Sequence, residues 1–267
     1  MEVNRSFLNY IKGFVAQKNV VKALIYREMI IKKNYSFLGF FGVILEPLIS
    51  TFLYLIILKL IRAEVNIGID PILFFATGIL IFSFFMSVVT RSISSIEANN
   101  SLFYYRKVKP IDTIIARTLV ELFLFSLLYG LIIFFVYFLK NEFVLDNFPL
   151  LTLILFLVNI LSFSFGLLMC VFGFKFELTK QIIPILSRPF FFTSGAIFSI
   201  SIVPDAFKGL ILWNPLLHAS ELARHFIDER YFLDNSISIF YLIKVSICTF
   251  ILSILLYMST EKDLLKR

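Results

Sequence analysis

The residues of this chain best suited to chemistry are two histidines and a glutamate close together in sequence. His218, Glu221 and His225 are separated by three and four positions, so on a helix they share one face. Zinc sites on a single helix use the order H-E-x-x-H, in which two histidines bind the metal and the glutamate acts as a base. The order here is different and a third ligand has no evident source. The sequence therefore predicts a polar face lining a vestibule, with no metal site and no catalytic residues.

The helix that carries these residues is predicted at Leu216–Arg230, with apolar residues at 3.6 periodicity along one side. The opposite side, which we call the polar arc, holds His218, Glu221, Arg224 and His225. Charges turned toward lipid are costly, so we expect the polar arc to face a water-filled opening at the membrane edge. The alternative is a helix that rests on the leaflet with this arc in bulk water.

Ionisable residues also lie inside predicted membrane spans, where each needs a partner or water. Glu46 precedes Pro47, which removes a backbone donor and is expected to kink its helix. Arg117 and Glu121 are four residues apart and can pair along one helix. Arg188 and Lys244 lie near span ends and can extend to the interface. These positions form no acidic relay across the membrane, which argues against proton coupling.

The segment Arg91–Asp112 is more apolar than a purely solvated loop requires. Aromatic residues beside arginine are common anchors of protein interfaces, so a docking element is favoured over a solvated loop. The residues assigned to it are Glu97, Asn100, Phe103, Tyr104, Tyr105 and Arg106.

The elements that position these residues are apolar helices. The chain is 59% hydrophobic and only 16% charged, with a mean hydropathy of +0.91, whereas soluble domains carry about 25% charged residues. Six stretches reach the roughly 20 apolar residues that a membrane crossing needs. They are Phe37–Leu60, Ile72–Val89, Thr113–Phe138, Leu150–Phe172, Ile182–Ile200 and Ile237–Met258.

Charge sets the predicted orientation. With both termini inside, the inner segments hold sixteen Lys and Arg residues and the outer segments six, which is a positive-inside bias. This distribution accounts for the net charge of +7 without nucleic-acid binding. We expect a multi-pass inner-membrane protein with both termini in the cytoplasm. The chain divides into a cytoplasmic region (1–36), a transmembrane domain (37–258) and a cytoplasmic tail (259–267).

Shorter elements flank the spans. Val20–Lys33 is partly amphipathic and is predicted to be an interfacial helix, and the long basic N-terminus does not fit a cleavable signal peptide. Pro204–Leu212 is predicted to be a helix too short to cross. Trp213 suits an interfacial anchor, and Asn214 and Pro215 end that helix. The predicted fold class is therefore all-α, with six transmembrane helices, an N-terminal interfacial helix and short outer helices between spans five and six.

No phosphate-binding G-x-x-x-x-G-K-[ST] motif occurs, and the longest segments outside the spans are too short for a nucleotidase domain. If ATP drives this protein, a separate chain must bind the ATP and Mg²⁺ and hydrolyse the ATP. Cys170 and Cys248 lie in apolar runs and are expected to be buried thiols rather than a disulfide or a metal pair.

Several of these segments resemble one known family. Ser95–Arg117 resembles the cytoplasmic loop and third span of ABC-2 type permeases of capsular polysaccharide exporters. Ile44–Pro47, Pro184–Pro189 and Leu212–Arg224 resemble the first span, the fifth span and the outer segment of the same family.

This resemblance implies a transporter of two permease copies and two ATPase copies, with Ser95–Tyr105 as the coupling helix that docks on the ATPase. It further implies that an acidic, lipid-terminated capsular polysaccharide is passed to periplasmic and outer-membrane partners. The polar arc would then lie at the periplasmic exit. Aromatic faces suit sugars and cations suit an acidic chain, so a pathway between two copies is expected to include Tyr54, Phe84, Phe85 and Arg188.

Other functions stay open from the sequence. A permease for O-antigen or teichoic acid shares this architecture. A secondary transporter or channel would show inverted internal repeats, and a membrane-embedded glycosyltransferase would need a carboxylate cluster and a soluble catalytic domain. The inverted repeats, the carboxylate cluster and the soluble catalytic domain are not evident in the sequence.

Overall fold

The computed structural model describes residues 2–34, 45, 48–56, 68–103, 108–140 and 145–264, and the regular elements in these ranges are helices. In chain order they are α1 (Glu2–Asn34), α3 (Pro71–Ile93), α4 (Ser95–Ala98), α5 (Asn100–Phe103), α6 (Pro110–Lys140), α7 (Phe148–Lys175), α8 (Thr179–Thr193), the 3-10 helix η1 (Ile200–Ile202), α9 (Asp205–Ile211), α10 (Pro215–Ile227) and α11 (Ile239–Leu264). The prediction of an all-helical protein is confirmed.

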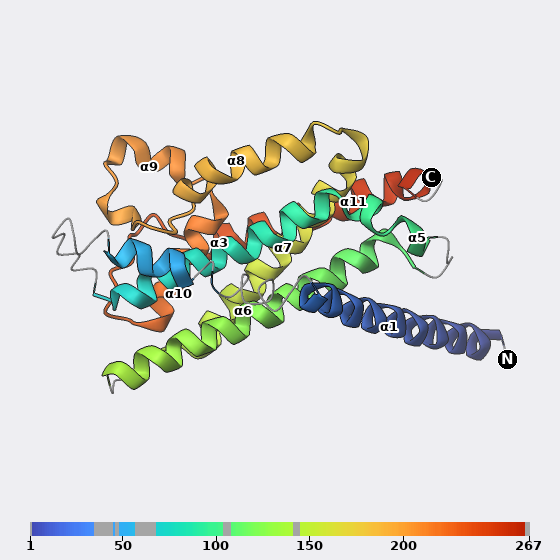
Figure 1. The fold of residues 1–267 in the computed structure, drawn as a ribbon, viewed down its shortest axis with the longest axis horizontal. Helices are drawn as coiled ribbons and strands as arrows, with labels where there is room; N and C mark the ends of the chain where they lie inside the picture. Colours follow the sequence, from blue (N-terminus) through green and yellow to red (C-terminus); the bar gives the residue numbers. More distant parts are fainter. Residues whose placement is uncertain are drawn as a thin grey trace.

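Four helices in the described part of the chain are long and apolar enough to cross a membrane, by length and composition: Pro71–Ile93, Pro110–Leu139, Phe148–Lys175 and Ile239–Leu264. They correspond to four of the predicted spans. Figure 1 shows α5 and the C-terminal end of α11 at one end of the molecule and α9 and α10 at the other. We call these the α5 end and the α10 end.

The two remaining predicted spans have different outcomes. Most of Phe37–Leu60 lies outside the described residues, although residues 48–56 are helical. The prediction of one continuous helix over Ile182–Ile200 is wrong, because α8 ends at Thr193 and its 15 residues measure only about 22 Å. Pro184 and Pro189 lie inside α8, and Gly195 follows it with a φ of 67°, a left-handed conformation that breaks the helix.

The ends of the helices follow from local sequence. Asp70 caps α3 by accepting a hydrogen bond from Ile72 N at 2.7 Å, and Pro71 occupies the first turn, where its missing N–H costs nothing. α9 begins after Pro204, close to the predicted position. By contrast, α1 begins at Glu2 and is much longer than the predicted Val20–Lys33 segment.

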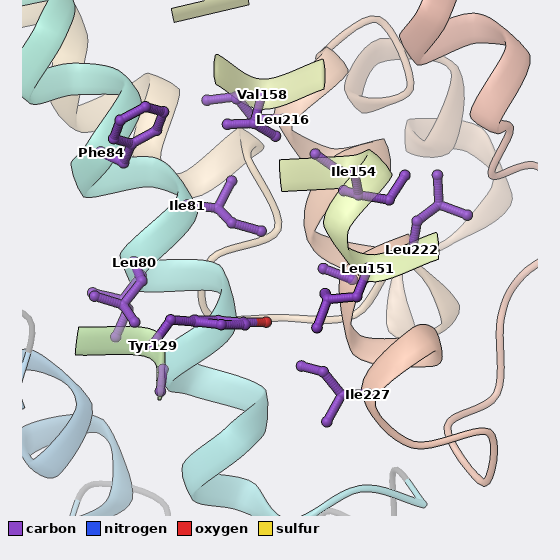
Figure 2. Packing of buried hydrophobic residues seen from close by; sticks show 14 of the residues in the cluster. Leu80, Ile81, Phe84, Tyr129, Leu151, Ile154, Val158, Leu216, Leu222 and Ile227 are labelled. Carbon is purple, nitrogen blue, oxygen red and sulfur yellow. The ribbon is translucent and has the colours of Figure 1, made fainter. Parts of the chain in front are cut away.

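The core lies where α3, α6, α7 and α10 meet. Figure 2 shows Leu80 and Ile81 of α3 and Tyr129 of α6 beside Ile154 of α7 and Leu222 of α10; all five are buried. A Cβ on Gly173 of α7 would lie 2.2 Å from the carbonyl oxygen of Ile93. Small residues of this kind let membrane helices approach closely, and here one brings α7 against the end of α3.

Candidate functional site

At the α10 end, an asparagine starts the helix that carries the polar arc. Asn214 Oδ1 accepts a hydrogen bond from Leu216 N at 2.9 Å, and Pro215 is the first residue of α10. Asn214 Nδ2 also donates to Thr193 Oγ1 at 3.1 Å, which ties the start of α10 to the end of α8. The sequence predicted that Asn214 and Pro215 end the preceding helix, and in the structure they begin α10.

Arg224 of α10 connects three separate segments. Its guanidinium donates to the carbonyl oxygens of Phe74 (3.1 Å), Gly195 (2.7 Å), Ala196 (3.2 Å) and Phe198 (3.4 Å). It also lies 3.7 Å from the centroid of the Phe74 ring, within cation–π range. One fully buried side chain thus joins α10 to α3 and to the non-helical segment after α8.

Glu221 is the charged partner of Arg224. Its Oε1 accepts from Arg224 Nη1 at 3.2 Å and from Ile200 N at 3.3 Å. Its Oε2 accepts from Tyr231 OH at 2.9 Å and from Ser199 Oγ at 3.3 Å. Burial raises the pKa of Glu221, while Arg224 and these donors oppose the shift. We refer to Glu221, Arg224, Tyr231 and Ser199 as the Arg224 cluster.

The Arg224 cluster depends on a close approach at Gly78 of α3. A Cβ at this position would lie 2.5 Å from both the Ala196 carbonyl oxygen and Arg224 Nη2. Real Cβ atoms do not tolerate such distances, so only glycine leaves room for the guanidinium beside α3.

The prediction that the whole polar arc faces a water-filled opening is wrong. Glu221 and Arg224 are 0% exposed and His218 is 3% exposed, whereas His225 is half-buried. The physical reason is that α10 packs against α3, α7 and α11, so its polar side meets protein as its apolar side does. Buried charge is tolerated here because each charged group has a partner and several hydrogen bonds.

The two histidines of the polar arc contact the main chain. His218 Nδ1 accepts from Ser238 N at 3.1 Å, so Nε2 carries the proton that is shared with the Leu212 carbonyl oxygen at 2.9 Å. Burial lowers the pKa of His218. His225 Nδ1 lies 3.0 Å from the Tyr231 carbonyl oxygen. This arrangement connects α10 to the start of α11 and to the turn after α10.

Toward the α5 end, a second charged cluster joins α1, α3 and α6. Glu28 of α1 pairs with Arg91 at 2.8 Å and with Arg117 at 3.3 Å. Glu121 pairs with Lys32 of α1 at 2.7 Å and with Arg91 at 2.8 Å. Burial lowers the pKa of Lys32, and its pairing with Glu121 opposes that shift.

The expected pairing of Arg117 with Glu121 along one helix is therefore replaced by ion pairs between helices. Arg117 Nη1 additionally donates to the Arg91 carbonyl oxygen. Glu28 and Lys32 of α1, for which no role was predicted from the sequence, are the partners of these residues. The i, i+4 spacing of the two in α1 is the signal that could have identified them.

The predicted docking segment is built from α4 and α5. Asn99, between these helices, is 2% exposed; its Nδ2 donates to the Ser95 carbonyl oxygen at 2.8 Å, and its Oδ1 accepts from Arg27 of α1. Glu97 and Asn100 are exposed, and Phe103 is half-buried against a cluster that includes Ile114. Tyr104, Tyr105 and Arg106 lie outside the described residues.

The residues proposed for a transport pathway are divided between core and surface. Phe84 and Phe85 are 4% and 3% exposed, so the prediction that they line a pathway is wrong for this structure. They pack on Phe125 and on Phe165, at ring-centroid distances of 5.2 and 5.3 Å, because the helices around α3 bury them.

The other two pathway candidates are more accessible. Tyr54 is half-buried, with its ring stacked on Phe75 at 5.8 Å. Arg188 is exposed on α8. Glu46 and Pro47, to which the sequence assigned a structural role, lie outside the described residues.

This all-helical architecture, with charged residues buried between helices, has recognisable relatives. A family model described as "ABC-2 type transporter" matches residues 19–227. The chain belongs to the ABC-2 type transporter family. The matched range extends from within α1 to the end of α10, so it includes the α4–α5 segment and every residue of the two charged clusters except Tyr231.

Individual relatives within the family are named for polysaccharide export. The chain is 36% identical to "Polysialic acid transport protein KpsM" of Escherichia coli over 253 residues, covering 95% of this chain and 98% of that protein. It is 30% identical to "Capsule polysaccharide export inner-membrane protein BexB" of Haemophilus influenzae, covering 80% and 81% of the two chains. It is 26% identical to "Capsule polysaccharide export inner-membrane protein CtrC" of Neisseria meningitidis serogroup A, covering 81% and 82%.

Proposed function

We propose that this protein is the membrane-spanning permease subunit of an ATP-driven exporter of capsular polysaccharide. The observation that carries this proposal is the similarity to a polysialic acid transport protein over 95% of this chain. The cargo is an acidic, lipid-terminated polysaccharide that leaves the cytoplasm across the inner membrane. A separate ATPase binds ATP and Mg²⁺, and this chain carries no catalytic residue.

The proposed orientation places the α5 end in the cytoplasm and the α10 end in the periplasm. The excess of Lys and Arg in the segments near the α5 end supports it. In this arrangement both termini are cytoplasmic, and residues 37–258 form the transmembrane domain. The exposed Trp213, beside α9 and α10, suits the outer membrane–water interface, where tryptophan is enriched.

The proposed ATPase-docking surface is the exposed side of α4 and α5. Glu97 accepts an ion-pair hydrogen bond from Lys180 at 2.6 Å yet keeps 61% of its side chain exposed. Asn99 holds this segment to α1 from the buried side through Arg27. Movement of α4 when the ATPase docks can therefore be transmitted to α1 through Asn99 and Arg27, and from α1 to α3 through the Glu28–Arg91 pair.

The complete transporter is proposed to hold two copies of this chain and two ATPase subunits. Polymer passes between the two copies, since the interior of one copy at the level of Phe84 is filled by side chains. Periplasmic and outer-membrane export proteins then receive the polymer.

Deletion of the gene in its encapsulated host tests the function. We expect capsular polymer to accumulate inside the deletion strain. A plasmid copy of the gene should restore export only if the ATPase gene is intact. Normal surface capsule in the deletion strain would overturn the proposal. Loss of O-antigen or teichoic acid with capsule unchanged would assign the permease to a different polymer.

Orientation is tested separately with single cysteines in a C170S/C248S background. The side chain of Asp205 is 95% exposed at the α10 end, and Asn100 is exposed at the α5 end. An impermeant thiol reagent added from the periplasm should label D205C and leave N100C unlabelled. The reverse pattern would overturn the proposed topology.

A further inference from the structure

A cavity of about 450 Å³ lies between α1, α3 and α6, toward the α5 end. Its charged lining residues are Arg27, Glu28, Lys32, Arg91, Arg117 and Glu121. They come from three helices that are far apart in sequence, so the cavity exists only in the folded protein. Neither the family match nor the names of the relatives assigns it a ligand.

Positive charge exceeds negative charge in this lining, with four cations and two carboxylates. Glu28 is shared by Arg91 and Arg117, and Glu121 is shared by Lys32 and Arg91. Arg27 donates to the amide of Asn99, which is a neutral group. Uncompensated positive charge is costly in a partly buried space, so an anion in this cavity would be stabilised.

A hydrogen-bond donor is also available to such an anion. Arg117 is 4% exposed, and among the described residues its Nε has no hydrogen-bond partner. A buried N–H without an acceptor costs free energy. Arginine binds phosphate oxygens strongly because its N–H groups match their geometry. The unused Nε of a cavity-lining arginine therefore indicates an oxyanion ligand.

The position of the cavity along the membrane-spanning helices indicates which molecule would supply that oxyanion. Arg91 lies in the last turn of α3. Arg117 lies seven residues into α6, about 10 Å along the helix from its start. Both positions are near the ends of candidate membrane spans, where lipid headgroups would lie if these helices cross the bilayer. Basic pockets between helices at this level can bind anionic lipids.

We propose that the cavity binds the phosphate group of an anionic phospholipid from the adjacent leaflet. The phosphate would lie near Arg27, Arg91 and Arg117, with the acyl chains in the neighbouring bilayer. Bound there, the lipid would hold α1 against α3 and α6. This site goes beyond the proposed export function and does not depend on the identity of the cargo.

The test uses the full-length chain in an uncharged detergent, with its melting temperature followed as phosphatidylglycerol, phosphatidylcholine or inorganic phosphate is added. Phosphatidylglycerol should raise the melting temperature, and the other two should not at the same concentration. R27Q should need about fivefold more phosphatidylglycerol for half the shift, the effect expected for one cation near an anionic lipid. K22Q is the matched control, because it removes one charge from an exposed position on the same helix.

Three results would overturn the proposal. They are equal shifts with phosphatidylglycerol and phosphatidylcholine, equal behaviour of R27Q and K22Q, and an equal or larger shift with inorganic phosphate. Native mass spectrometry of the wild-type protein gives a second measurement that does not depend on the folding of R27Q. Phosphatidylglycerol should stay bound in preference to phosphatidylcholine, and no preference would count against the site.

Discussion

The guanidinium of Arg224 and the carboxylate of Glu221 meet at 3.2 Å inside the helical bundle, and neither side chain has any exposed surface. The two residues are one helical turn apart on α10, but their other contacts reach α3, the segment after α8 and the turn after α10. The pair thus organises the α10 end of the protein from within.

Replacing Arg224 with methionine should strongly destabilise the protein. The change removes the guanidinium hydrogen bonds to four carbonyl oxygens and leaves Glu221 without its counter-charge. Breaking a buried pair from one side costs about 3–5 kcal/mol. The melting temperature of the purified protein in detergent should fall markedly, whereas D205N, at a highly exposed site, should leave it near the wild-type value.

The double variant E221Q/R224M shows how much of this loss of stability comes from the unpaired charge of Glu221. Because it removes both charges, it should be less destabilised than R224M alone. A double variant as unstable as the sum of the two single variants would show that the two residues act independently.

Gly78→Ala should prevent close packing of α3 against the segment after α8. The added methyl group would lie 2.5 Å from Ala196 O and from Arg224 Nη2, so the helix or the Arg224 cluster must move. Overpacking of this kind typically costs about 1–3 kcal/mol. Gly130→Ala in α6 is the matched control, since a Cβ there meets nothing within 4 Å.

The yield of monodisperse protein in size-exclusion chromatography and the melting temperature measure this effect. G78A should be reduced in both, and G130A in neither. Equal values for the two variants would show that the close approach at Gly78 is not required.

His218 should make the protein less stable at mildly acidic pH. Burial lowers its pKa from the ordinary value of 6.5, and protonation of Nδ1 would remove the acceptor of the Ser238 N–H. Between the lowered pKa and about 6.5 the unfolded chain binds more protons than the folded one, so stability falls as the pH drops through this window. Above about pH 6.5 the contribution of neutral His218 is fully present.

Melting temperatures at about pH 7.5 and about pH 5.5 compare the protein above and below the ordinary histidine pKa of 6.5. H218Q offers an amide oxygen and an amide N–H in place of the two ring nitrogens but does not titrate, so it should lose less stability on acidification than the wild type. His225 is retained in both proteins and provides an internal control. An identical acid shift in the two proteins would assign the effect to other groups.

Substitutions on the exposed side of α4 and α5 should weaken ATPase binding without unfolding the permease. We expect E97A/N100A to retain the wild-type melting temperature, since both side chains are exposed, and to recover several-fold less ATPase in co-purification. K180Q removes the ion-pair partner of Glu97 but leaves the carboxylate in place, which makes it a matched control.

If E97A/N100A recovered ATPase at the wild-type level, the docking surface would lie elsewhere. If K180Q lost as much ATPase as the double variant, the Lys180–Glu97 pair, rather than the exposed surface itself, would be the element that matters for docking.

Much of this architecture could be predicted from the sequence, because its causes are local. Four of the predicted spans correspond to helices, since long apolar runs have no other means of satisfying their backbone in lipid. The short helix after Pro204 and a further helix from Leu216 were also predicted, because proline acts on adjacent residues.

The partners of charged residues were decided only by the tertiary structure. Helical periodicity states which residues share a face, but not whether that face meets water or protein. For that reason the polar arc was predicted to face water, whereas Glu221 and Arg224 are buried among α3, Ser199 and Tyr231. Similarly, the spacing of Arg117 and Glu121 suggested a pair along one helix. In the structure their partners are Glu28 and Lys32 of α1, about 90 residues away in sequence.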